Sequence, residues 1–568
     1  MALLAVLAGC AAVDRQPAEF ERGAEADGAM VAVAHPLAAE AGREMLEAGG
    51  SAADAAIAAQ LVLNLVEPQS SGIGGGGFAL HYHGDDGGIT AYDGRETAPA
   101  EIGPELFLDD DGGPVGYREA VVGGRSVGVP GLLRMLEVLH ADHGVLPWED
   151  LFQPAIHLAR DGFTVTPRLH GMIAGDPWLA DQPATRAYFF TADGAPLPVG
   201  HRLRNPEFAE VLQQVAEGGV DRFYHGAIAE SIVSTVRHAE GNPGLLHPDD
   251  LAAYRAVRRA PVCRPYRGHT VCGMPPPTSG GVAVLQILGI LEHFDSDVLD
   301  PRTVDGAHLL AEVSRLAFAD RERFLADPDF SPVPVAALLD PDYLAGRAGC
   351  VDPERSMGEA WPGLPAWLIG APDHREVAAT SHLSVVDFDG NAVSMTTSIE
   401  QAFGSRLMVH GFLLNNQLTD FSFRPEDEEG RPVANRPEPG KRPRSSMAPM
   451  LILDEEGAFR AVVGSPGGPR IIGFVAQRVV ALLDAGLSIN EAVAMPNVVN
   501  RNGPTELEEG RSVESIADAL RRRGHTVEIV PLTSGLHGIE AVPGSGALRG
   551  AADPRREGAA LGLPPRGL

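Results

Sequence analysis

The sequence predicts a protein of the α/β or α+β class that contains a substantial amount of β-sheet. Helical and strand-like patterns are mixed along the whole chain, and no internal repeat or long low-complexity linker separates them. The 568 residues are 44% hydrophobic and 21% charged, so the chain can bury a large core and is not disordered by composition. It forms one large domain or two to three domains of ordinary size.

The helical segments carry capping signals as well as apolar periodicity. Ser51 is placed to cap a helix in which Asp54 takes the third position, and Gly49-Gly50 ends the helix before it. Asn205-Pro206 opens another helix in the same manner. Further apolar-periodic runs predict helices at residues 280–294, 306–325, 470–486 and 512–524, the last followed by a strand at 525–530.

Two strands are predicted around Thr380, where a strand begins abruptly at a pair of hydroxyl residues. Alternation in HLSVVDF and NAVSMTTS, with Asp389-Gly390 between the runs, is typical of a hairpin with a tight turn. Taken alone, Thr380 and Ser381 are ordinary strand residues, because β-branched side chains suit pleated surfaces.

Two of the four cysteines lie in a second predicted hairpin. A turn at Arg267-Gly268 places Cys263 directly opposite Cys272 in a close, non-hydrogen-bonded pair, where a disulfide is feasible. Two small hydrophobic strand residues are an equally good interpretation. Cys350 stands alone.

The first residues resemble an export signal. A short apolar run ends in Leu7-Ala8-Gly9-Cys10, which resembles the lipobox of bacterial lipoproteins, in which the cysteine is lipidated. The usual basic n-region is missing, so either the true start lies upstream or the match is a chance one. We expect an exported protein, periplasmic or held at the cell surface by lipid at Cys10. No other run reaches the length of a membrane-spanning helix.

Charge and glycine patterns narrow the function classes. The 76 acidic and 45 basic side chains give a formal charge of -31, which opposes binding to nucleic acid or to an anionic membrane surface. The run at Gly72–Gly77 has dinucleotide-fingerprint spacing, but it follows a helical pattern instead of a strand, and no P-loop lysine is present. The run at Gly464–Gly468 follows a strand and precedes a helix, so its backbone N–H groups can bind an oxyanion.

These segments together resemble the γ-glutamyltransferase family of N-terminal-nucleophile hydrolases. Thr380-Ser381-His382, GNAVSMTTS, LLNNQLTDFS, GKRPRSSMAP and GSPGGPR occur in that family's order and approximate spacing. HPLAAEAGREMLEAGGSAADAAIAA, SSGIGGGGF, YDGRETAP, MPPPTSGG and FADRERFLADPDF resemble its large subunit, and GAADPRREGAA resembles its C-terminal end. The resemblance covers the chain from about Val31 to Ala560.

The resemblance implies an α+β fold, a four-layer αββα sandwich that large and small subunits form from one precursor. The chain is expected to cut itself between Ala379 and Thr380. Residues 1–30 are then the signal and linker, 31–379 the large subunit and 380–568 the small subunit, which stay together as an obligate heterodimer.

The same resemblance assigns chemical roles at the new N-terminus. The Thr380 hydroxyl is the nucleophile, and its own α-amine, with an ordinary pKa of about 8, accepts the proton. Ser398 supports the Thr380 hydroxyl and amine. Gly467 and Gly468 donate N–H bonds to the tetrahedral oxyanion.

A γ-glutamyl group also carries an α-carboxylate and an α-ammonium, which need opposite charges at two ends of a pocket. By resemblance, the carboxylate is held by Arg95 with Ser445 and Ser446, the arginine through bidentate bonds. The ammonium is received by Glu400, Gln417 and Asp420.

Some positions depart from the family's common pattern. Position 398 is often Thr, and position 400 is Asn in many members and acidic in others, but neither change removes a required group. The segment from Arg424 to Pro443, rich in proline and charge, is expected to be a flap without regular structure. It lacks the Tyr or Trp with which some relatives close the site.

The implied function is transfer of γ-glutamyl groups from glutathione or related donors to amino acids, peptides or water, through an acyl-threonine and without a cofactor or metal. The family also contains cephalosporin (glutaryl) acylases, so an amidase of that type is one alternative. An unprocessed lipoprotein that binds amino acids without turnover is another. The intact nucleophile, glycines and charged groups favour an enzyme.

Overall fold

The structure is a computed structural model that describes residues 22–364, 379–511 and 514–566. Cys10 and the lipobox-like segment lie outside the described residues, so lipidation stays a prediction. Among the helices that are described, none is both long and apolar enough to cross a bilayer.

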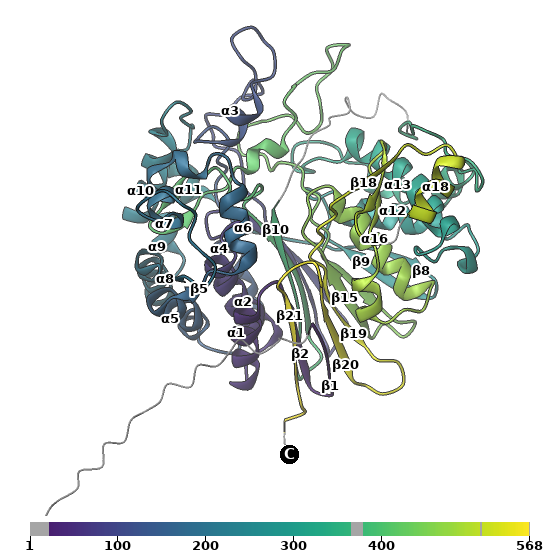
Figure 1. Cartoon of the computed structure of the whole chain (residues 1–568), viewed down its shortest axis with the longest axis horizontal. Coiled ribbons are helices and arrows are strands. Elements are labelled where there is room, and N and C mark those ends of the chain that lie inside the picture. The colour runs from purple at the N-terminus through teal and green to yellow at the C-terminus, as the bar shows by residue number, and fades with distance from the viewer. Residues whose placement is uncertain (1–21, 365–378, 512–513, 567–568) are drawn as a thin grey trace, which may run out of the picture.

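Two seven-stranded sheets lie face to face in the centre of the molecule (Figure 1), and every pairing within them is antiparallel. In spatial order, the strands of the first sheet are β21 (Ala559–Leu563), β2 (Ala29–Val33), β10 (Thr380–Val386), β11 (Ala392–Ser398), β3 (Gly76–Tyr82), β4 (Ile89–Gly94) and β7 (Val257–Arg259). Those of the second are β1 (Gly23–Ala26), β20 (Leu548–Ala552), β19 (His537–Ala541), β15 (Phe459–Gly464), β14 (Met450–Leu453), β9 (His269–Gly273) and β8 (Val262–Tyr266).

Helices cover the outer face of each sheet, purple and blue on one side of Figure 1 and teal and green on the other. The helices that pack on the first sheet are α1 (Pro36–Glu47), α2 (Ala52–Val66) and α4 (Leu132–His143). The second sheet carries α12 (Gly280–Leu291) and α16 (Arg470–Leu483), with α13 (Val304–Phe324) packed against α12. The expected four-layer αββα arrangement is confirmed.

Smaller elements surround this sandwich. The other helices are α3 (Tyr117–Val121), α5 (Gln153–Asp161), α6 (Pro167–Gly175), α7 (Pro183–Phe189), α8 (Pro206–Gly218), α9 (Asp221–Tyr224), α10 (Ala227–Arg237), α11 (Pro248–Ala253), α14 (Val335–Leu338), α15 (Pro341–Ala348), α17 (Ile489–Ala494) and α18 (Glu514–Arg522). The remaining strands are β5 (Phe163–Thr164), β6 (Arg202–Leu203), β12 (Met408–Val409), β13 (Phe412–Leu413), β16 (Val498–Asn500), β17 (Thr505–Glu508) and β18 (Val527–Val530).

Two large apolar clusters hold the layers together. The first joins Leu383 of β10 to Leu61 of α2, under the helices of the first sheet. The second joins Leu80 of β3 to Val462 of β15 and Ile287 of α12, so it links the two sheets and continues under the opposite helices. Each fully buried side chain of this kind stabilises the fold by about 1.5–3 kcal/mol relative to exposure.

The hairpin predicted at Thr380, with its tight turn at Asp389-Gly390, is confirmed. The Gly390 N–H donates to the Asp387 carbonyl at 3.2 Å, and β10 pairs with β11 as far as Val386 and Ala392. The Asp387 carboxylate accepts the backbone N–H groups of Asp389 and Asn391, so this side chain organises the turn. Every residue of both strands is buried, because helices cover one face and the second sheet covers the other.

The predicted helices are confirmed with small shifts at their ends. The Ser51 side chain and Asp54 form the expected capping box of α2, and the Asn205 side chain caps α8. No helix or strand is assigned within residues 424–443. Its far end is nevertheless anchored, since buried Lys441 donates hydrogen bonds to the Ala434 carbonyl and the Glu438 carboxylate.

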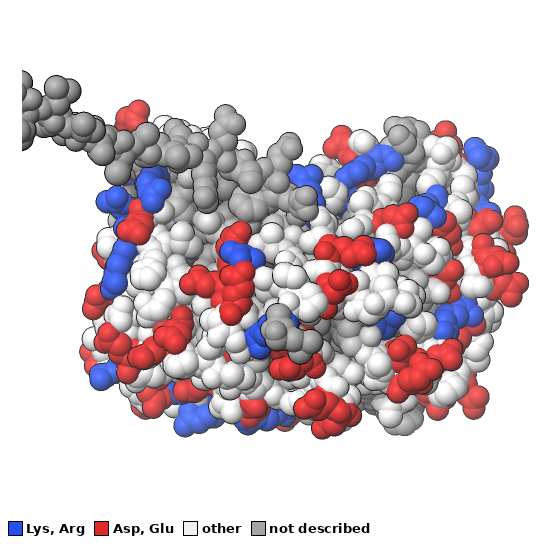
Figure 2. All heavy atoms as spheres, turned by 90° about the horizontal axis from the view of Figure 1, so that it is seen from below, with Lys and Arg blue, Asp and Glu red and all other residues white. Residues whose placement is uncertain are grey.

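The surface carries the negative charge that the composition requires. On the face in Figure 2, acidic side chains are spread widely among fewer basic ones. This face offers no continuous basic track of the kind that binds nucleic acid.

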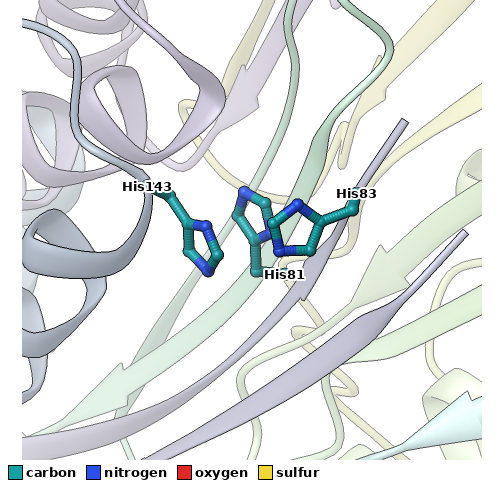
Figure 3. Close-up of side chains that lie close together, drawn as sticks. All are labelled: His81, His83 and His143. Carbon is teal, nitrogen blue, oxygen red and sulfur yellow. The ribbon is translucent and has the colours of Figure 1, made fainter. Parts of the chain in front are cut away.

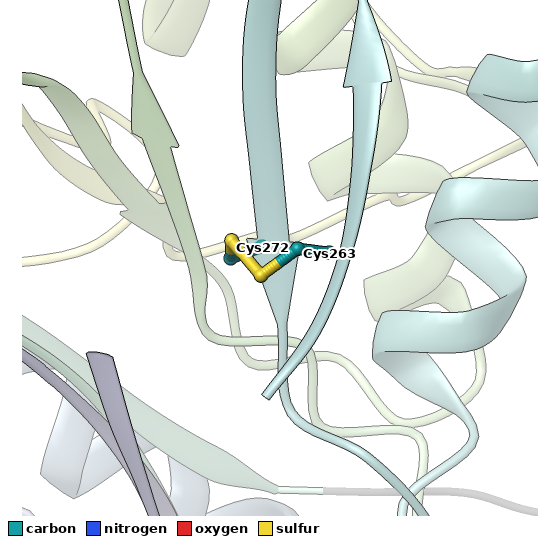
Figure 4. Close-up of a disulfide and its surroundings, with 2 residues drawn as sticks. All are labelled: Cys263 and Cys272. Carbon is teal, nitrogen blue, oxygen red and sulfur yellow. A yellow bond between two sulfur atoms is a disulfide. The ribbon is translucent and has the colours of Figure 1, made fainter. Parts of the chain in front are cut away.

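Cys263 and Cys272 face each other in the β8–β9 register and are joined by a disulfide (Figure 4). Cys350 is exposed and is a free cysteine among the described residues.

We expect unreduced protein from an oxidising compartment to yield a peptide pair in which Cys263 is linked to Cys272. The paired strands already hold these residues opposite each other, so the bond closes a preformed contact. Mass spectrometry after alkylation without reduction checks this, and Cys350 should carry the alkyl group as an internal control. Alkylation of all three cysteines would contradict the pairing and weaken the case for export.

Candidate active site

Thr380 lies at the start of a central strand, between β2 and β11, and is 2% exposed. The register of β10 and β11 places it directly opposite Ser398. The Thr380 hydroxyl donates to Ser398 Oγ at 3.3 Å, and the Ser398 hydroxyl donates to the Ala379 carbonyl at 2.8 Å. One serine thus touches both the expected nucleophile and the peptide bond that precedes it.

The backbone beyond β11 folds back to hold this pair. Glu400 has a φ of +76°, in the left-handed region that few side chains favour, so the chain turns sharply after Ser398. Its N–H donates to Ser398 Oγ at 2.8 Å, while its carbonyl accepts the N–H of Ala379 at 2.6 Å. Backbone strain is here tied to the position of the reacting groups.

The glycine run before β3 has a packing role beside this corner. A Cβ on Gly75 would lie 2.2 Å from the Ser398 carbonyl oxygen, which no side chain tolerates. Only glycine lets β3 come this close to the end of β11. The sequence argument against a dinucleotide site is thereby supported.

Eight of the ten residues expected in the site line one pocket. They are Thr380, Ser398, Glu400, Gln417, Asp420, Ser445, Ser446 and Gly468, joined by Met447 and Ile471. Gly467 lines a neighbouring pocket together with Ala379. Arg95 lines neither of these two pockets.

Acceptor groups gather at one end of this pocket. The short 3-10 helix Gln417–Asp420 presents both of its end residues, and the Gln417 amide donates to Asp420 Oδ2 at 2.8 Å. The Gln417 carbonyl oxygen Oε1 is buried without a hydrogen-bond partner among the described residues. A buried acceptor left open in this way, beside the carboxylates of Glu400 and Asp420, suits a cationic ligand group.

Arg95 stands behind Asp420 instead of lining the pocket. Its Nη2 lies 2.5 Å from Asp420 Oδ2 and donates to the Arg444 carbonyl, and its Nε donates to the Pro443 carbonyl at 3.0 Å. Burial raises the pKa of the adjacent Glu96 carboxyl to about 8, although Arg95 acts in the opposite direction. The Arg95 guanidinium holds Asp420 in place, and it also holds the backbone of residues 443–444, which leads to Ser445 and Ser446.

Two serine hydroxyls also line the pocket, and a second arginine stands behind one of them. The Ser445 hydroxyl accepts the Met447 N–H at 3.1 Å, and the Ser446 hydroxyl accepts a bond from Arg321 Nη2 at 2.5 Å. Arg321 comes from α13, is 1% exposed, and also donates to Ser279 Oγ. Sequence reasoning missed Arg321 as a site residue, although it lies in the family-like segment FADRERFLADPDF.

The turn between β15 and α16 needs its glycines. Gly467 has a φ of +135° and Gly468 a φ of +60°, and a Cβ on Gly467 would lie 2.8 Å from the Phe474 ring. This turn leads into the N-terminus of α16, where backbone N–H groups and the helix dipole favour negative charge.

A buried ion network supports the nucleophile from behind, and sequence reasoning missed it too. Arg556 Nη1 donates to the Thr380 carbonyl at 3.2 Å, and Glu67 accepts bonds from Ser381 and Arg168. Burial, followed by the charge of Arg168, lowers the pKa of Arg556 to about 9. The only sequence signal for Arg556 is the family-like segment GAADPRREGAA.

Comparison with known proteins shows similarity over nearly the whole chain. The family model described as gamma-glutamyltranspeptidase matches residues 38–563. The glutathione hydrolase proenzyme of Escherichia coli (strain K12) is 38% identical over 538 residues, which cover 93% of this chain and 90% of that protein. The acylase ACY 1 proenzyme of Pseudomonas sp. (strain SE83) is 38% identical over 560 residues and covers 97% and 95%.

A solved structure extends the likeness to the whole fold. The crystal structure of cephalosporin acylase from Bacillus halodurans matches with a TM-score of 0.84 and 29% identity, covering 98% of this chain and 99% of that one. The family model covers every residue that lines the pocket and all strands of the two sheets except β1 and β2. The chain therefore belongs to the γ-glutamyltranspeptidase family and is an enzyme of that family.

Proposed function

We propose that this protein is a self-processing γ-glutamyltransferase that moves γ-glutamyl groups from glutathione or related donors to amino acids, peptides or water. The observation that carries the proposal is that one pocket is lined by Thr380, by the carboxylates of Glu400 and Asp420, and by the hydroxyls of Ser445 and Ser446. Such a pocket matches an amino acid whose side-chain amide reacts while its α-carboxylate and α-ammonium are held.

The first step is cleavage of the chain at residue 379. The Ser398 hydroxyl polarises the Ala379 carbonyl, and the Thr380 hydroxyl attacks its carbon. The C–N bond breaks, the Thr380 nitrogen takes the proton and becomes a free amine, and Ala379 is left as an ester on Thr380. Water then hydrolyses the ester, which releases the Ala379 carboxylate and frees the hydroxyl.

Turnover uses the group that cleavage creates. The Thr380 amine accepts the hydroxyl proton while the oxygen attacks the γ-amide carbonyl, and the N–H groups of the Gly467-Gly468 turn stabilise the oxyanion. The proton passes to the leaving amine, and an acyl-threonine remains. An acceptor amine or water attacks this ester and restores the hydroxyl.

The pocket ends match the two charges of the donor. The substrate carboxylate lies against Ser445 and Ser446, with Arg321 supplying positive charge through Ser446. The ammonium meets Glu400, Asp420 and the open Gln417 oxygen. The expected bond from Arg95 to the carboxylate stays a prediction, since this arginine contacts Asp420 in the structure.

Subunit association and export complete the proposal. Each sheet contains strands from both sides of residue 379, so the cut products remain one heterodimer. Export is supported by the Cys263–Cys272 disulfide, which persists in oxidising compartments. Attachment by lipid at Cys10 is proposed on the sequence alone.

An acylase that removes glutaryl groups is the second candidate, because one relative is named an acylase and one structural neighbour a cephalosporin acylase. A glutaryl group lacks the α-amine. Glu400 favours a γ-glutamyl substrate over a glutaryl one. Asp420 is already paired with Arg95, so Glu400 supplies a further negative charge in the pocket for the substrate ammonium.

We expect purified protein to contain two chains, the smaller one beginning Thr-Ser-His. Thr380→Ala should give one intact, inactive chain because it lacks the attacking hydroxyl, whereas Thr380→Ser keeps a hydroxyl and should still be cut. A denaturing gel and N-terminal sequencing of the smaller band measure this. Cleavage of the alanine variant at the same bond would rule out Thr380 as the processing nucleophile, and an uncut parent protein would favour the binding lipoprotein.

Arg95→Lys should weaken catalysis on donors with a free α-carboxylate by about 1.5–3 kcal/mol in kcat/KM. Lysine keeps the charge but cannot bond Asp420 and the carbonyls of Pro443 and Arg444 together. Steady-state kinetics with a γ-glutamyl anilide measure the loss, and Arg43→Lys on the surface of α1 is the control. Kinetics equal to the control would exclude Arg95 from the site.

Glu400→Gln should lower kcat/KM for a γ-glutamyl anilide by about 1.5–3 kcal/mol, through loss of a charged contact to the ammonium. The glutaryl anilide has no such group, so its kcat/KM should be unchanged or higher. Glutamine is a suitable replacement because it keeps side-chain length at a left-handed position. A parent protein that prefers the glutaryl compound, or an equal loss on both, would overturn the ammonium contact.

A further inference from the structure

Three histidines lie together outside the active site, where the end of β3 meets the end of α4 (Figure 3). His81 belongs to β3, His83 follows that strand by one residue, and His143 is the last residue of α4. One ring nitrogen from each lies within 4.8 Å of the other two. The proposed γ-glutamyl chemistry makes no use of these side chains.

Hydrogen bonding within the protein does not account for the cluster. His81 is 1% exposed, and its Nδ1 has no hydrogen-bond partner among the described residues. A second group, His308, Glu312 and His525, gives a contrast: there His308 Nδ1 bonds His525 Nε2 at 2.7 Å and the other His308 nitrogen bonds a carbonyl. That second group satisfies itself, whereas the first leaves a buried ring nitrogen open.

His143 is oriented by neighbours of the kind that support metal ligands. The Tyr92 hydroxyl donates to Asp142 Oδ2 at 2.9 Å and lies 2.6 Å from His143 Nε2, and Asp142 is held by two bonds from Arg258. The Tyr92 hydroxyl has one proton, and it donates that proton to Asp142. The bond between Tyr92 and His143 must then be donated by the Nε2–H of His143. His143 Nδ1 then carries the lone pair.

The rings need only a local movement to bind an ion. The His81 and His143 rings are parallel, with centroids 3.6 Å apart, and the ring of His83 lies edge-on to both. A tetrahedral ion with bonds of about 2.0–2.1 Å holds its ligand atoms about 3.3 Å apart, so the nitrogens must close in and one stacked ring must turn. His83 and His143 are only half-buried, which leaves room for that turn.

We propose that His81, His83 and His143 form a binding site for one divalent transition-metal ion of the Zn²⁺ type, which ties the end of β3 to the end of α4. Three imidazoles suit zinc, cobalt, nickel or copper and leave one position for water. The sequence analysis expects no metal, so this site is a departure from it. His81 lies five positions along β3 from Gly76, the partner of Ser398, which is about 17 Å of strand. The ion is therefore structural.

The test uses the processed, untagged protein after removal of metal with a chelator. Titration with Co²⁺ should give the visible absorption of a tetrahedral site, saturating at one ion per heterodimer. Calorimetry should detect one Zn²⁺ site per heterodimer. His83→Gln and His143→Gln should each weaken binding at least tenfold. The exposed His225→Gln is the matched control and should bind like the parent.

Thermal unfolding separates a bound ion from a damaged fold. Zn²⁺ should raise the Tm of the parent protein and of His225→Gln but not that of His83→Gln, and cleavage at residue 379 should be unchanged in every variant. The proposal would be overturned if the parent lacked a site for one ion. It would also be overturned if His83→Gln and His143→Gln bound the ion with the affinity of the parent. Failure of the γ-glutamyl assay would leave this result untouched, because binding is read without substrate.

Discussion

The pairing of β10 with β11 is the constraint on which the rest of this molecule depends. It sets Thr380 opposite Ser398, and it buries both strands between a helical layer and a second sheet. A slip of one residue would turn every side chain of β10 to the opposite face. The apolar clusters on both faces therefore fix the position of one hydroxyl, and the glycines beside it allow the neighbouring strands to come close enough.

Around that fixed hydroxyl, charge is organised in opposed pairs instead of single groups. Arg95 is bonded to Asp420, Arg321 to Glu322, and Arg168 to Glu67. Buried charges of this kind are costly unless each one has a partner. Within the pocket, the Gln417 oxygen is a buried acceptor without a hydrogen-bond partner among the described residues.

Local signals made much of this structure predictable. The caps of α2 and α8 are set by short-range hydrogen bonds, and the strand–glycine–helix order around Gly467 can be read from neighbouring residues. The fold and the pocket residues followed from a family resemblance that spans the chain. Contacts between distant segments could not be predicted from the sequence. Arg95 lies against Asp420 and not in the pocket, and Arg321 bonds Ser446, which is 125 positions away.

The proposed cut would have a consequence for folding, because both sheets combine strands from the two sides of residue 379. β2 lies between β21 and β10, and β11 lies between β10 and β3, so each piece supplies strands that the other needs. In the uncut chain, these pairings form within one molecule, at a high effective concentration. In the cut protein, the same sheets could be rebuilt only when two separate unfolded chains meet. The proposed cleavage would therefore leave a fold that is maintained by slow unfolding, in an arrangement that the separated pieces reach far less readily.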